Sequence, residues 1–425
     1  MAVVNPNRLT GFFDPAKETL SREARRHYQQ TWLRELIQHA WAKAPGVRRR
    51  MEAAGLSPRD LSDIDALSKL PVLKKSALPE LQRADPPFGG FSTIPREELR
   101  QVFISPGPIY EPIGPEQSPW RAEIALYAGG FRRGDLVVNT FMYHLTPLAH
   151  LVDRGLAVLG CPVVPTGPGN TEMQVKVIRD LRVNGYIGTP SFLMTILKRA
   201  EELGAGRLPL EVAHVGAEPL PESLRQSFEE EHGILTRQVY GTADVGIVTY
   251  ECPAKAGMHI LDDVIFEICD PETGVPLPLG ETGEVVVTAN HPFYPMIRFG
   301  TGDLSLVTDA PCSCGRTSPR MLGWRGRADE MTKVRGMFIH PRLADETVAR
   351  VSGISRYQVV VTRKEHLDEL LFRVELTGAA DSPAVAAALP QAIRDVMKLR
   401  GQVEVVPRGT IPDGAKKILD ERKWE

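Results

Sequence analysis

A chain of 425 residues is longer than a single hydrophobic core supports, about 250–300 residues, so two unequal domains are expected. The composition, 42% hydrophobic and 24% charged, is that of a globular protein, and a formal charge of −2 offers no cationic excess for nucleic acid. The most apolar stretch, residues 145–164, is interrupted by His150, Asp153 and Arg154, so no membrane span is expected.

The start of the chain does not have the pattern of a secretory signal, because residues 1–13 lack a charged region followed by a long apolar one. We therefore expect a cytoplasmic protein. The five cysteines are odd in number and irregularly spaced. In a reducing compartment we expect them to be free or bound to a metal.

The first expected elements are two surface helices within residues 20–54, where apolar positions recur at helical spacing and Pro45 breaks the pattern. From about residue 134, short β runs alternate with helical stretches, which predicts βαβ units and a largely parallel sheet. The expected strand and helix pairs are 135–141 with 145–160, 161–167 with 171–183, 185–189 with 190–203, and 211–218 with 221–233.

Ligands of such sheets bind beyond the carboxyl ends of the strands. Three loops follow expected strands and are therefore candidate sites: GTPS (188–191), GAEP (216–219) and YGTAD (240–244). After residue 246 the pattern is strand-rich and indicates a β subdomain. A Gly/Arg/Asp-rich segment near 326–336 then precedes a different α+β pattern, so we place a domain boundary between Arg327 and Asp329.

Four motifs occur in the order found in the acyl-adenylate-forming superfamily: VYGTADVG, RFGTGDL, GWRGRADEMTKVRGMFIHP and IPDGAKKILDERK. The chain resembles more closely the phenylacetate–CoA ligases, from LSKLPVLKKSAL through GPGNTEMQV and GTPSFL to the last lysines. The resemblance implies an α/β fold. Residues 1–328 would form a large N-terminal adenylate-forming domain that binds ATP and the acid, with a mainly parallel sheet and a β subdomain. Residues 329–425 would form a small, mobile α+β C-terminal domain.

The implied enzyme is an AMP-forming acid–CoA ligase that uses ATP, Mg²⁺ and coenzyme A to convert an aryl or arylacetic acid, through an acyl-adenylate, into its CoA thioester. Its partners would be these small molecules, without nucleic acid or membrane, and relatives suggest a homodimer. Three rival hypotheses stay open. They are an AMP-transferring enzyme of the same fold, an impaired regulatory module that binds nucleotide or acyl-CoA, and a ligase that acylates a carrier-protein thiol.

The phosphate loop departs from the family pattern, a Ser/Thr/Gly-rich run that ends in Lys. This chain has FISPGPIYEP at 103–112, with prolines at 106, 108 and 112. Proline has no N–H to donate, so successive backbone amides cannot cradle the phosphates. Either Ser105, Gly107 and nearby side chains bind the phosphates differently, or ATP use is impaired.

Two loops are expected to line the acid and the adenine. FMYHLTP (141–147) offers Phe141, Tyr143 and His144 where relatives line the acyl pocket, although Phe141 could equally be core. GAEP resembles the adenine-binding turn, in which small residues let backbone approach a flat ring; a plain strand-to-helix turn is the alternative. Its residues are Gly216, Ala217, Glu218 and Pro219.

YGTAD resembles the stretch that contacts adenine, phosphate and metal. The resemblance assigns stacking on adenine to Tyr240, contact with phosphate to Thr242 and binding of Mg²⁺ to Asp244. Gly241 follows Tyr240 in the motif and belongs to the same nucleotide-binding stretch. The family usually has Glu at the last position. Asp is one methylene shorter, so the ion would sit closer to the strand or be bound through water.

Cys252, His259, Cys312 and Cys314 supply the three thiols and one imidazole of a tetrahedral zinc site, and similar positions bind zinc in some relatives. Such a closed site would be structural. Buried cysteines without a ligand are the alternative. The remaining two, Cys161 and Cys269, are expected in the core.

The resemblance assigns the ribose hydroxyls to Asp303, in TGD, although such turns are common. In GRADEM, Arg327 would lie near ATP phosphate and Asp329 would be the hinge between domains. Gly336 would line the pantetheine path, where a residue without Cβ leaves room.

IPDGAKKILD contains the lysine expected to reach the α-phosphate and the acyl oxygen during adenylation. We assign this role to Lys416, four residues after Pro412 and just past a glycine turn. Ala415 interrupts the usual Gly-Lys pair, so Lys417 is an alternative, and a solvated lysine pair is another.

Overall fold

The structure is a computed structural model that describes residues 6–105, 107–115, 120–328, 332–335, 337–339, 341–378 and 382–422. The chain separates into two compact units, Met1–Ala328 and Asp329–Glu425. Each unit has its own hydrophobic core.

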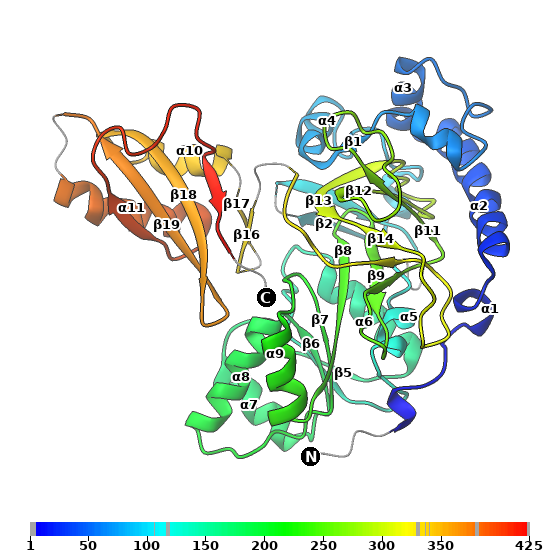
Figure 1. Ribbon diagram of the computed structural model, residues 1–425, viewed down its shortest axis with the longest axis horizontal. Coiled ribbons are helices and arrows are strands. Elements are labelled where there is room, and N and C mark those ends of the chain that lie inside the picture. The colour runs from blue at the N-terminus through cyan, green and yellow to red at the C-terminus, as the bar shows by residue number, and fades with distance from the viewer. Residues whose placement is uncertain are drawn as a thin grey trace. The chain divides into compact units, whose positions relative to one another are not determined.

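The larger unit is built on a mixed sheet whose middle strands are parallel (Figure 1). Strands β5, β4, β6, β7 and β8 pair in parallel, and β9, β10, β15 and β14 continue the sheet antiparallel. In sheet order the strands are β14 (Val307–Thr308), β15 (Arg320–Met321), β10 (Met258–Ile260), β9 (Gly246–Glu251), β8 (Leu235–Thr242), β7 (Val212–Val215), β6 (Gly185–Gly188), β4 (Val137–Asn139) and β5 (Val163–Pro165). This confirms the predicted α/β class.

Helices cover both faces of this sheet because its strands are apolar on both sides. Val138, Tyr186 and Ala213 belong to one core, whereas the alternate residues Val137 and Val212 belong to the other. In Figure 1, α7, α8 and α9 lie on one side and α5 and α6 on the other. Their bounds are α5 (Ala122–Ala128), α6 (Leu148–Leu159), α7 (Thr171–Asp180), α8 (Pro190–Glu202) and α9 (Glu222–Gln226), the last followed by the π-helical turn η5 (Ser227–Glu231).

The predicted N-terminal helices form α2 (Arg22–Lys43) and α3 (Pro45–Ala53). The Ser21 side chain caps the first, and Pro45 occupies the first turn of the second, where no N–H is needed. The other helical segments of this region are η1 (Pro6–Arg8), α1 (Pro15–Glu18), η2 (Asp65–Lys69), η3 (Lys75–Ala77), α4 (Leu78–Ala84) and η4 (Arg96–Glu98).

A second sheet of the larger unit has the order β1, β13, β12, β11, and β2 pairs with β3 as a separate hairpin. Strand β1, which follows the N-terminal helices, pairs in parallel with β13. It is therefore joined to the strand that carries TGD. The bounds are β1 (Leu73–Lys74), β13 (Phe299–Ser305), β12 (Gly283–Ala289), β11 (Val264–Cys269), β2 (Gln101–Ser105) and β3 (Ile109–Ile113). Of the strands in the strand-rich region predicted after residue 246, β11, β12 and β13 lie in this sheet, whereas β9, β10, β14 and β15 lie in the main sheet.

The smaller unit is α+β. Its sheet has the order β20, β19, β18, β21, beside the hairpin β16–β17 and the helices α10 and α11. The bounds are β16 (Thr332–Val334), β17 (Met337–Ile339), α10 (Pro341–Ala349), β18 (Ile354–Lys364), β19 (Leu367–Leu376), α11 (Ser382–Met397), β20 (Gln402–Val405) and β21 (Ile418–Asp420).

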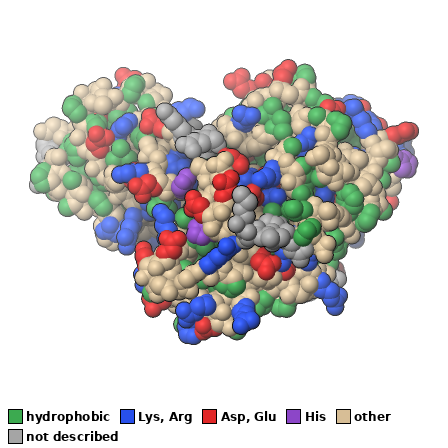
Figure 2. Space-filling view, turned by 60° about the horizontal axis from the view of Figure 1, so that its bottom comes forward, with side chains coloured by type: hydrophobic (Ala, Val, Ile, Leu, Met, Phe, Trp, Pro, Cys, Tyr) green, Lys and Arg blue, Asp and Glu red, His purple; other side chains and the backbone are tan. Residues whose placement is uncertain are grey.

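Surface charge agrees with the near-neutral sequence. On the face shown in Figure 2, Lys and Arg side chains are mixed with Asp and Glu, and neither sign covers the face alone. Among the helices of the described ranges, none combines the length and apolarity needed to cross a bilayer.

Candidate active site

The turn expected to bind adenine follows β7, and its backbone is unusual. The Gly216 N–H donates to the Gly188 carbonyl at 3.2 Å, which ties the turn to the end of β6. A Cβ on Gly216 would lie 2.9 Å from Val239 Cγ1, so a larger residue would push β8 away. Ala217 follows with φ +67°, a left-handed conformation that few residues other than glycine adopt. Glu218 and Pro219 complete the turn, half-buried at the carboxyl end of the sheet.

Tyr240 and Asp303 meet beside this turn. The Tyr240 hydroxyl donates to Asp303 Oδ2 at 3.0 Å, and burial, with the nearby Asp303 charge, raises the pKa of Tyr240 well above its usual value, so the hydroxyl keeps its proton. Asp303 Oδ1 accepts from Trp324 Nε1 at 3.0 Å and from Arg327 at 2.9 Å. The structure thus brings together Tyr240, Asp303 and Arg327, which we expected at the adenine, the ribose and the phosphate. It adds Trp324, which stands in a quoted motif but was not assigned a role.

Glycine permits the tight hairpin that follows Tyr240. A Cβ on Gly241 would lie 2.2 Å from the Gly246 carbonyl oxygen, so only a residue without a side chain lets β8 and β9 approach this closely. The hairpin carries Asp244 into the interior, whereas Thr242 is half-buried. The Thr242 hydroxyl oxygen is itself buried and has no hydrogen-bond partner among the described residues.

Asp244 lies in a buried cluster with Lys75 and Glu111. The Lys75 ammonium is 2.5 Å from Asp244 Oδ2, and both side chains are nearly inaccessible. Burial, and next the Asp244 charge, hold the pKa of the Glu111 carboxyl well above its usual value. Asp244 Oδ1 and Glu111 Oε2 are buried without hydrogen-bond partners among the described residues. Such oxygen donors fit Mg²⁺, which prefers carboxylates and other hard ligands.

Sequence reasoning missed Lys75 and Glu111 as site residues, although both stand in segments it had singled out. Lys75 belongs to LSKLPVLKKSAL and Glu111 to the proline-rich loop. A charged residue within a mostly apolar stretch of sequence was the available signal for both. Only the tertiary contacts identify the partners of these residues.

The proline-rich loop is the turn of the β2–β3 hairpin. The strands pair from Gln101 with Ile113 to Ser105 with Ile109, so main-chain groups on both sides of the turn bond to one another. The Ser105 hydroxyl, which we expected near phosphate, donates to Glu111 Oε1 at 2.6 Å. Residue 106 lies outside the described residues. The geometry differs from a glycine-rich loop whose amides point outward.

The segment expected to line the acid pocket lies against this hairpin, since the Ile104 N–H donates to the Leu145 carbonyl at 2.7 Å. Phe141 is buried and packs in the core, the alternative considered above, whereas His144 is exposed. The Tyr143 hydroxyl donates to Asp153 Oδ2 at 2.9 Å, and burial raises the pKa of Asp153.

Two further aromatic groups, which the sequence did not suggest, stand beside Tyr143. The ring of His150 lies 5.2 Å, between centroids, from the rings of both Tyr143 and Phe103. The hairpin and the helix α6 therefore present a group of aromatic side chains at the end of β4.

The structure gathers the four expected zinc ligands, although Cys252 and Cys314 lie far apart in the sequence. The ligand atoms of Cys252, His259, Cys312 and Cys314 all lie within 4.8 Å of one another. Cys252 Sγ is 3.7 Å from Cys312 Sγ, close to the separation of about 3.8 Å that two Zn–S bonds of about 2.3 Å give at a tetrahedral angle.

The surroundings of this cluster also suit a metal. His259 Nδ1 is 3.1 Å from the Ser318 carbonyl oxygen, a contact that would leave Nε2 as the ligand atom, 3.4 Å from Cys314 Sγ. Hydrogen bonding from Cys252 and from His259 lowers the pKa of Cys314 to about 3, so a thiolate is available. Cys161 and Cys269 are buried in the protein interior, as expected.

The two candidate lysines differ in what they contact. Lys417 forms an ion pair with Asp345, with its Nζ 2.7 Å and 2.8 Å from the two carboxylate oxygens. The Lys416 side chain is exposed, and we find no ion pair for it within the described ranges. Gly414, with φ +76°, makes the turn that precedes them.

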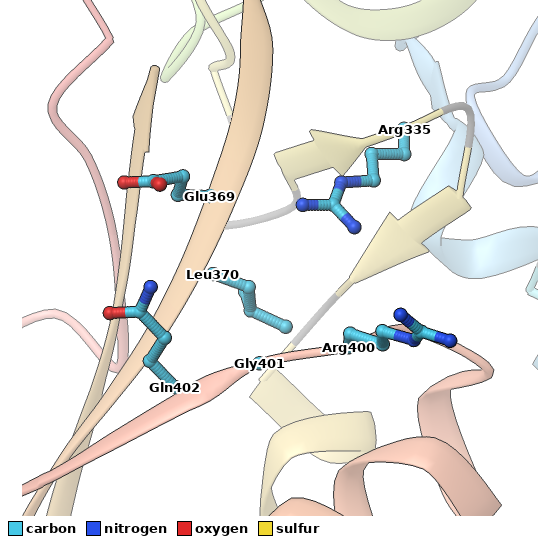
Figure 3. A pocket seen from close by; sticks show the side chains of 6 residues that line it. All are labelled: Arg335, Glu369, Leu370, Arg400, Gly401 and Gln402. Carbon is cyan, nitrogen blue, oxygen red and sulfur yellow. The ribbon is translucent and has the colours of Figure 1, made fainter. Parts of the chain in front are cut away.

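The predicted hinge, Asp329, and the predicted pantetheine-path residue, Gly336, lie outside the described residues. Next to the latter, Arg335 lines a pocket of about 280 Å³ together with Arg400 and Gln402 (Figure 3). Arg335 Nε donates to the Asp368 carbonyl at 2.9 Å. Two guanidinium groups suit an anion, but the pocket also contains Glu369 and none of the predicted site residues.

Comparison with known proteins gives the class of this fold and site. The family "AMP-binding enzyme" matches residues 125–293, and "AMP-binding enzyme C-terminal domain" matches residues 336–422. A phenylacetate-coenzyme A ligase of Thermus thermophilus is 32% identical, over 97% of this chain and all of its own length. A phenylacetate-coenzyme A ligase of Aromatoleum evansii is 31% identical, over 96% of this chain and 97% of its own.

The chain therefore belongs to the phenylacetate–coenzyme A ligase family of AMP-binding enzymes. It is an ATP-dependent, AMP-forming acid–CoA ligase that works through an acyl-adenylate. Among solved structures, a 2-hydroxyisobutyryl-CoA ligase in complex with 2-HIB-AMP and CoA is 28% identical, with a TM-score of 0.89, over 100% of this chain and 94% of that one. The amide bond synthetase McbA from Marinactinospora thermotolerans shares the fold, with a TM-score of 0.57, 18% identity and 93% coverage of both chains.

Proposed function

We propose that the acid activated by this ligase is an aryl or arylacetic carboxylic acid. The observation that carries the proposal is the nearly full-length similarity to relatives named phenylacetate-coenzyme A ligase. The aromatic side chains of Phe103, Tyr143 and His150 at the end of β4 support an aromatic substrate. Of the pocket residues we expected, His144 has the least structural support, because its side chain is exposed.

The nucleotide site follows from the contacts around Asp303. We assign the ribose hydroxyls to this carboxylate, because hydrogen bonds from Tyr240, Trp324 and Arg327 fix both of its oxygens. Tyr240 would place its ring against adenine, beside the turn at Gly216–Pro219. Arg327 would stand at the phosphate end, where its charge opposes that of the nucleotide.

Adenylation needs positive charge, because a carboxylate is a poor electrophile and the attack builds negative charge on the α-phosphate. We assign Mg²⁺ to Asp244, with Thr242 at the phosphate; the ion, when bound, neutralises phosphate charge. The buried, unpartnered oxygens of both residues support this assignment. Lys416 would supply the second cation at the acyl oxygen.

Lys416 is the better candidate of the pair because, within the described part of the chain, its ammonium forms no ion pair with an acid. Lys417 would first have to break its contact with Asp345. Thioester formation needs the lysine to withdraw, so we propose a rotation of the C-terminal domain about Asp329 that brings Gly336 to the pantetheine path. One pocket then serves both half-reactions.

Zinc in this protein would be structural. Three thiols and one imidazole close a tetrahedral shell and leave no open position for water. The site would join the end of β9 to β10 and to the turn before β15, at the antiparallel side of the main sheet. The short distances among the four ligand atoms support this assignment.

We also propose a cytoplasmic homodimer. The free cysteines of the described residues suit a reducing compartment, and the dimer rests on the family resemblance alone. Analytical ultracentrifugation at several protein concentrations measures the oligomeric state directly.

The experiment that tests the function is a panel of carboxylic acids assayed for AMP release that depends on both ATP and CoA, with acyl-CoA detected as product. Arylacetic and benzoic-type acids should give the highest kcat/KM, and short aliphatic acids should give less. Adenylation without acyl-CoA would favour an AMP-transferring enzyme or a carrier-protein acceptor. Binding without turnover would favour a regulatory module, the interpretation that the proline-rich hairpin supports.

A further inference from the structure

The carboxylate of Asp303, to which we assign the ribose hydroxyls, is held by side chains from two other segments of the larger unit. Its Oδ2 accepts a hydrogen bond from the Tyr240 hydroxyl at 3.0 Å. Its Oδ1 accepts two, from Trp324 Nε1 at 3.0 Å and from Arg327 at 2.9 Å. The side chain of Asp303 is 13% exposed, so a ligand can reach it. Such a ligand has to share the two oxygens with these donors.

The number of acceptor positions on Asp303 limits what this carboxylate can bind. An ionised carboxylate accepts about four hydrogen bonds, two at each oxygen. Donors from the described residues fill both positions at Oδ1 and one position at Oδ2, which leaves one open. A ribose presents two neighbouring hydroxyl donors. Both hydroxyls can therefore bind Asp303 only if one of the present donors leaves Oδ1.

The main chain on both sides of Trp324 is fixed to β13 and to the residue that follows it. The Leu322 N–H donates to the Leu306 carbonyl at 2.9 Å. The Arg325 N–H donates to the Leu304 carbonyl at 2.8 Å. The half-buried indole has two rotatable bonds and a single donor, so it has little freedom to leave Oδ1. Trp324 is therefore the donor that stays.

Arg327 is better suited to leave Oδ1. Its guanidinium has five N–H donors on a flexible stem, and its positive charge finds a new partner in the phosphates of a nucleotide. A ribose hydroxyl that replaces it at Oδ1 keeps the Asp303 oxygen hydrogen-bonded. By contrast, the neutral indole of Trp324 would lose a hydrogen bond to a charged acceptor and gain no ionic partner in return.

We propose that Trp324 is a positioning residue of the nucleotide site, which holds Asp303 Oδ1 while a ribose hydroxyl takes the place of Arg327 on the same oxygen. Each carboxylate oxygen then has one protein donor, Tyr240 at Oδ2 and Trp324 at Oδ1, and one position for a ribose hydroxyl. In the empty enzyme Arg327 occupies one of these positions and competes with the ribose. This role of Trp324 rests on the proposed function, in which Asp303 binds the ribose.

Binding of AMP to the full chain, measured by calorimetry without Mg²⁺, acid or CoA, tests the positioning role. Trp324→Phe should weaken AMP binding about tenfold or more, because it removes a hydrogen bond to a charged acceptor. It should weaken binding of 2′-deoxy-AMP and 3′-deoxy-AMP less, because each lacks one hydroxyl for Asp303 to orient. The control Trp41→Phe, at a half-buried tryptophan of α2, should change none of the three affinities. Equal losses for all three nucleotides in Trp324→Phe would indicate a purely structural effect and overturn the proposal.

Binding of adenosine tests the exchange at Oδ1, because adenosine has both ribose hydroxyls and no phosphate to attract Arg327. Arg327→Met should bind adenosine about threefold more tightly than wild type, since no contact has to be broken first. The control Arg325→Met removes an exposed arginine of the same segment and should leave the affinity unchanged. Unchanged or weaker adenosine binding in Arg327→Met would refute the proposal. If Trp324→Phe does not fold, this measurement alone decides.

The wild type shows whether a failure lies in this role of Trp324 or in the proposed function. If Asp303 binds both hydroxyls, wild type should prefer AMP to either deoxy nucleotide. A wild type without that preference would refute the ribose assignment, and the role of Trp324 with it. A wild type with the preference, together with equal losses in Trp324→Phe, would refute the role of Trp324 alone. Because no acid is present, none of these results depends on which acid the enzyme activates.

Discussion

Replacing Lys416 with alanine should separate the two half-reactions of this ligase. The side chain is exposed and unpaired within the described residues, so the substitution should cost little stability. A charge contact made in the transition state of a water-excluded site contributes about 3–5 kcal/mol, which corresponds to a factor of about 10²–10⁴ in rate. Adenylation should fall by this factor, whereas transfer of a preformed acyl-adenylate to CoA should keep a near wild-type rate.

Lys417→Ala is the matched control, because it removes an adjacent lysine whose contacts are visible. Its ion pair with Asp345 joins side chains that are 46% and 47% exposed, and such surface pairs contribute about 0.2–1 kcal/mol. The expected effect on adenylation is therefore less than tenfold. ATP–pyrophosphate exchange measures the first half-reaction and acyl-CoA formation from synthetic acyl-adenylate the second. Loss of exchange in Lys417→Ala with exchange intact in Lys416→Ala would refute our choice of lysine; no effect of either would refute a role of this segment in adenylation.

Three other changes test separate parts of the site. Wild-type protein should contain about one zinc ion per chain by elemental analysis, and Cys314→Ser should lose it and unfold at a lower temperature; metal-free wild type would dismiss the zinc site. Tyr240→Phe should raise the KM for ATP about tenfold, because a hydrogen bond to a charged carboxylate contributes about 1.5 kcal/mol or more, and an unchanged KM would show that Asp303 does not need the hydroxyl. Asp329→Pro should retain adenylation and lose thioester formation, because proline fixes φ at the proposed hinge; equal loss of both half-reactions would count against a hinge.

Local sequence patterns predicted most of the fold. The alternation of β runs and helical stretches between residues 134 and 233 gave the parallel strands and their helices, because apolar runs and caps are local features. Pro45 similarly marked the break between the two N-terminal helices. YGTAD was expected as a loop after a strand; that it is a tight antiparallel hairpin, in which Gly241 approaches the Gly246 carbonyl closely, is a finding of the structure.

Features that depend on distant contacts could not be predicted. Lys75 reaches Asp244 across 169 residues because β1 pairs with β13, and no periodicity in the sequence encodes that pairing. The choice between the two lysines depended on Asp345, which lies 72 residues before Lys417. The cysteine cluster is the exception, since residue types with strong metal affinity indicate their own partners.

The central claim is that this chain activates an acid at the expense of ATP despite a phosphate loop without the usual amide donors. Acid-dependent ATP–pyrophosphate exchange, measured on folded protein supplied with Mg²⁺, tests it most directly because it needs neither CoA nor domain rotation. We expect exchange with arylacetic or benzoic-type acids that disappears when either acid or Mg²⁺ is left out. No exchange with any acid would contradict the account and leave a protein that binds its ligands without activating them.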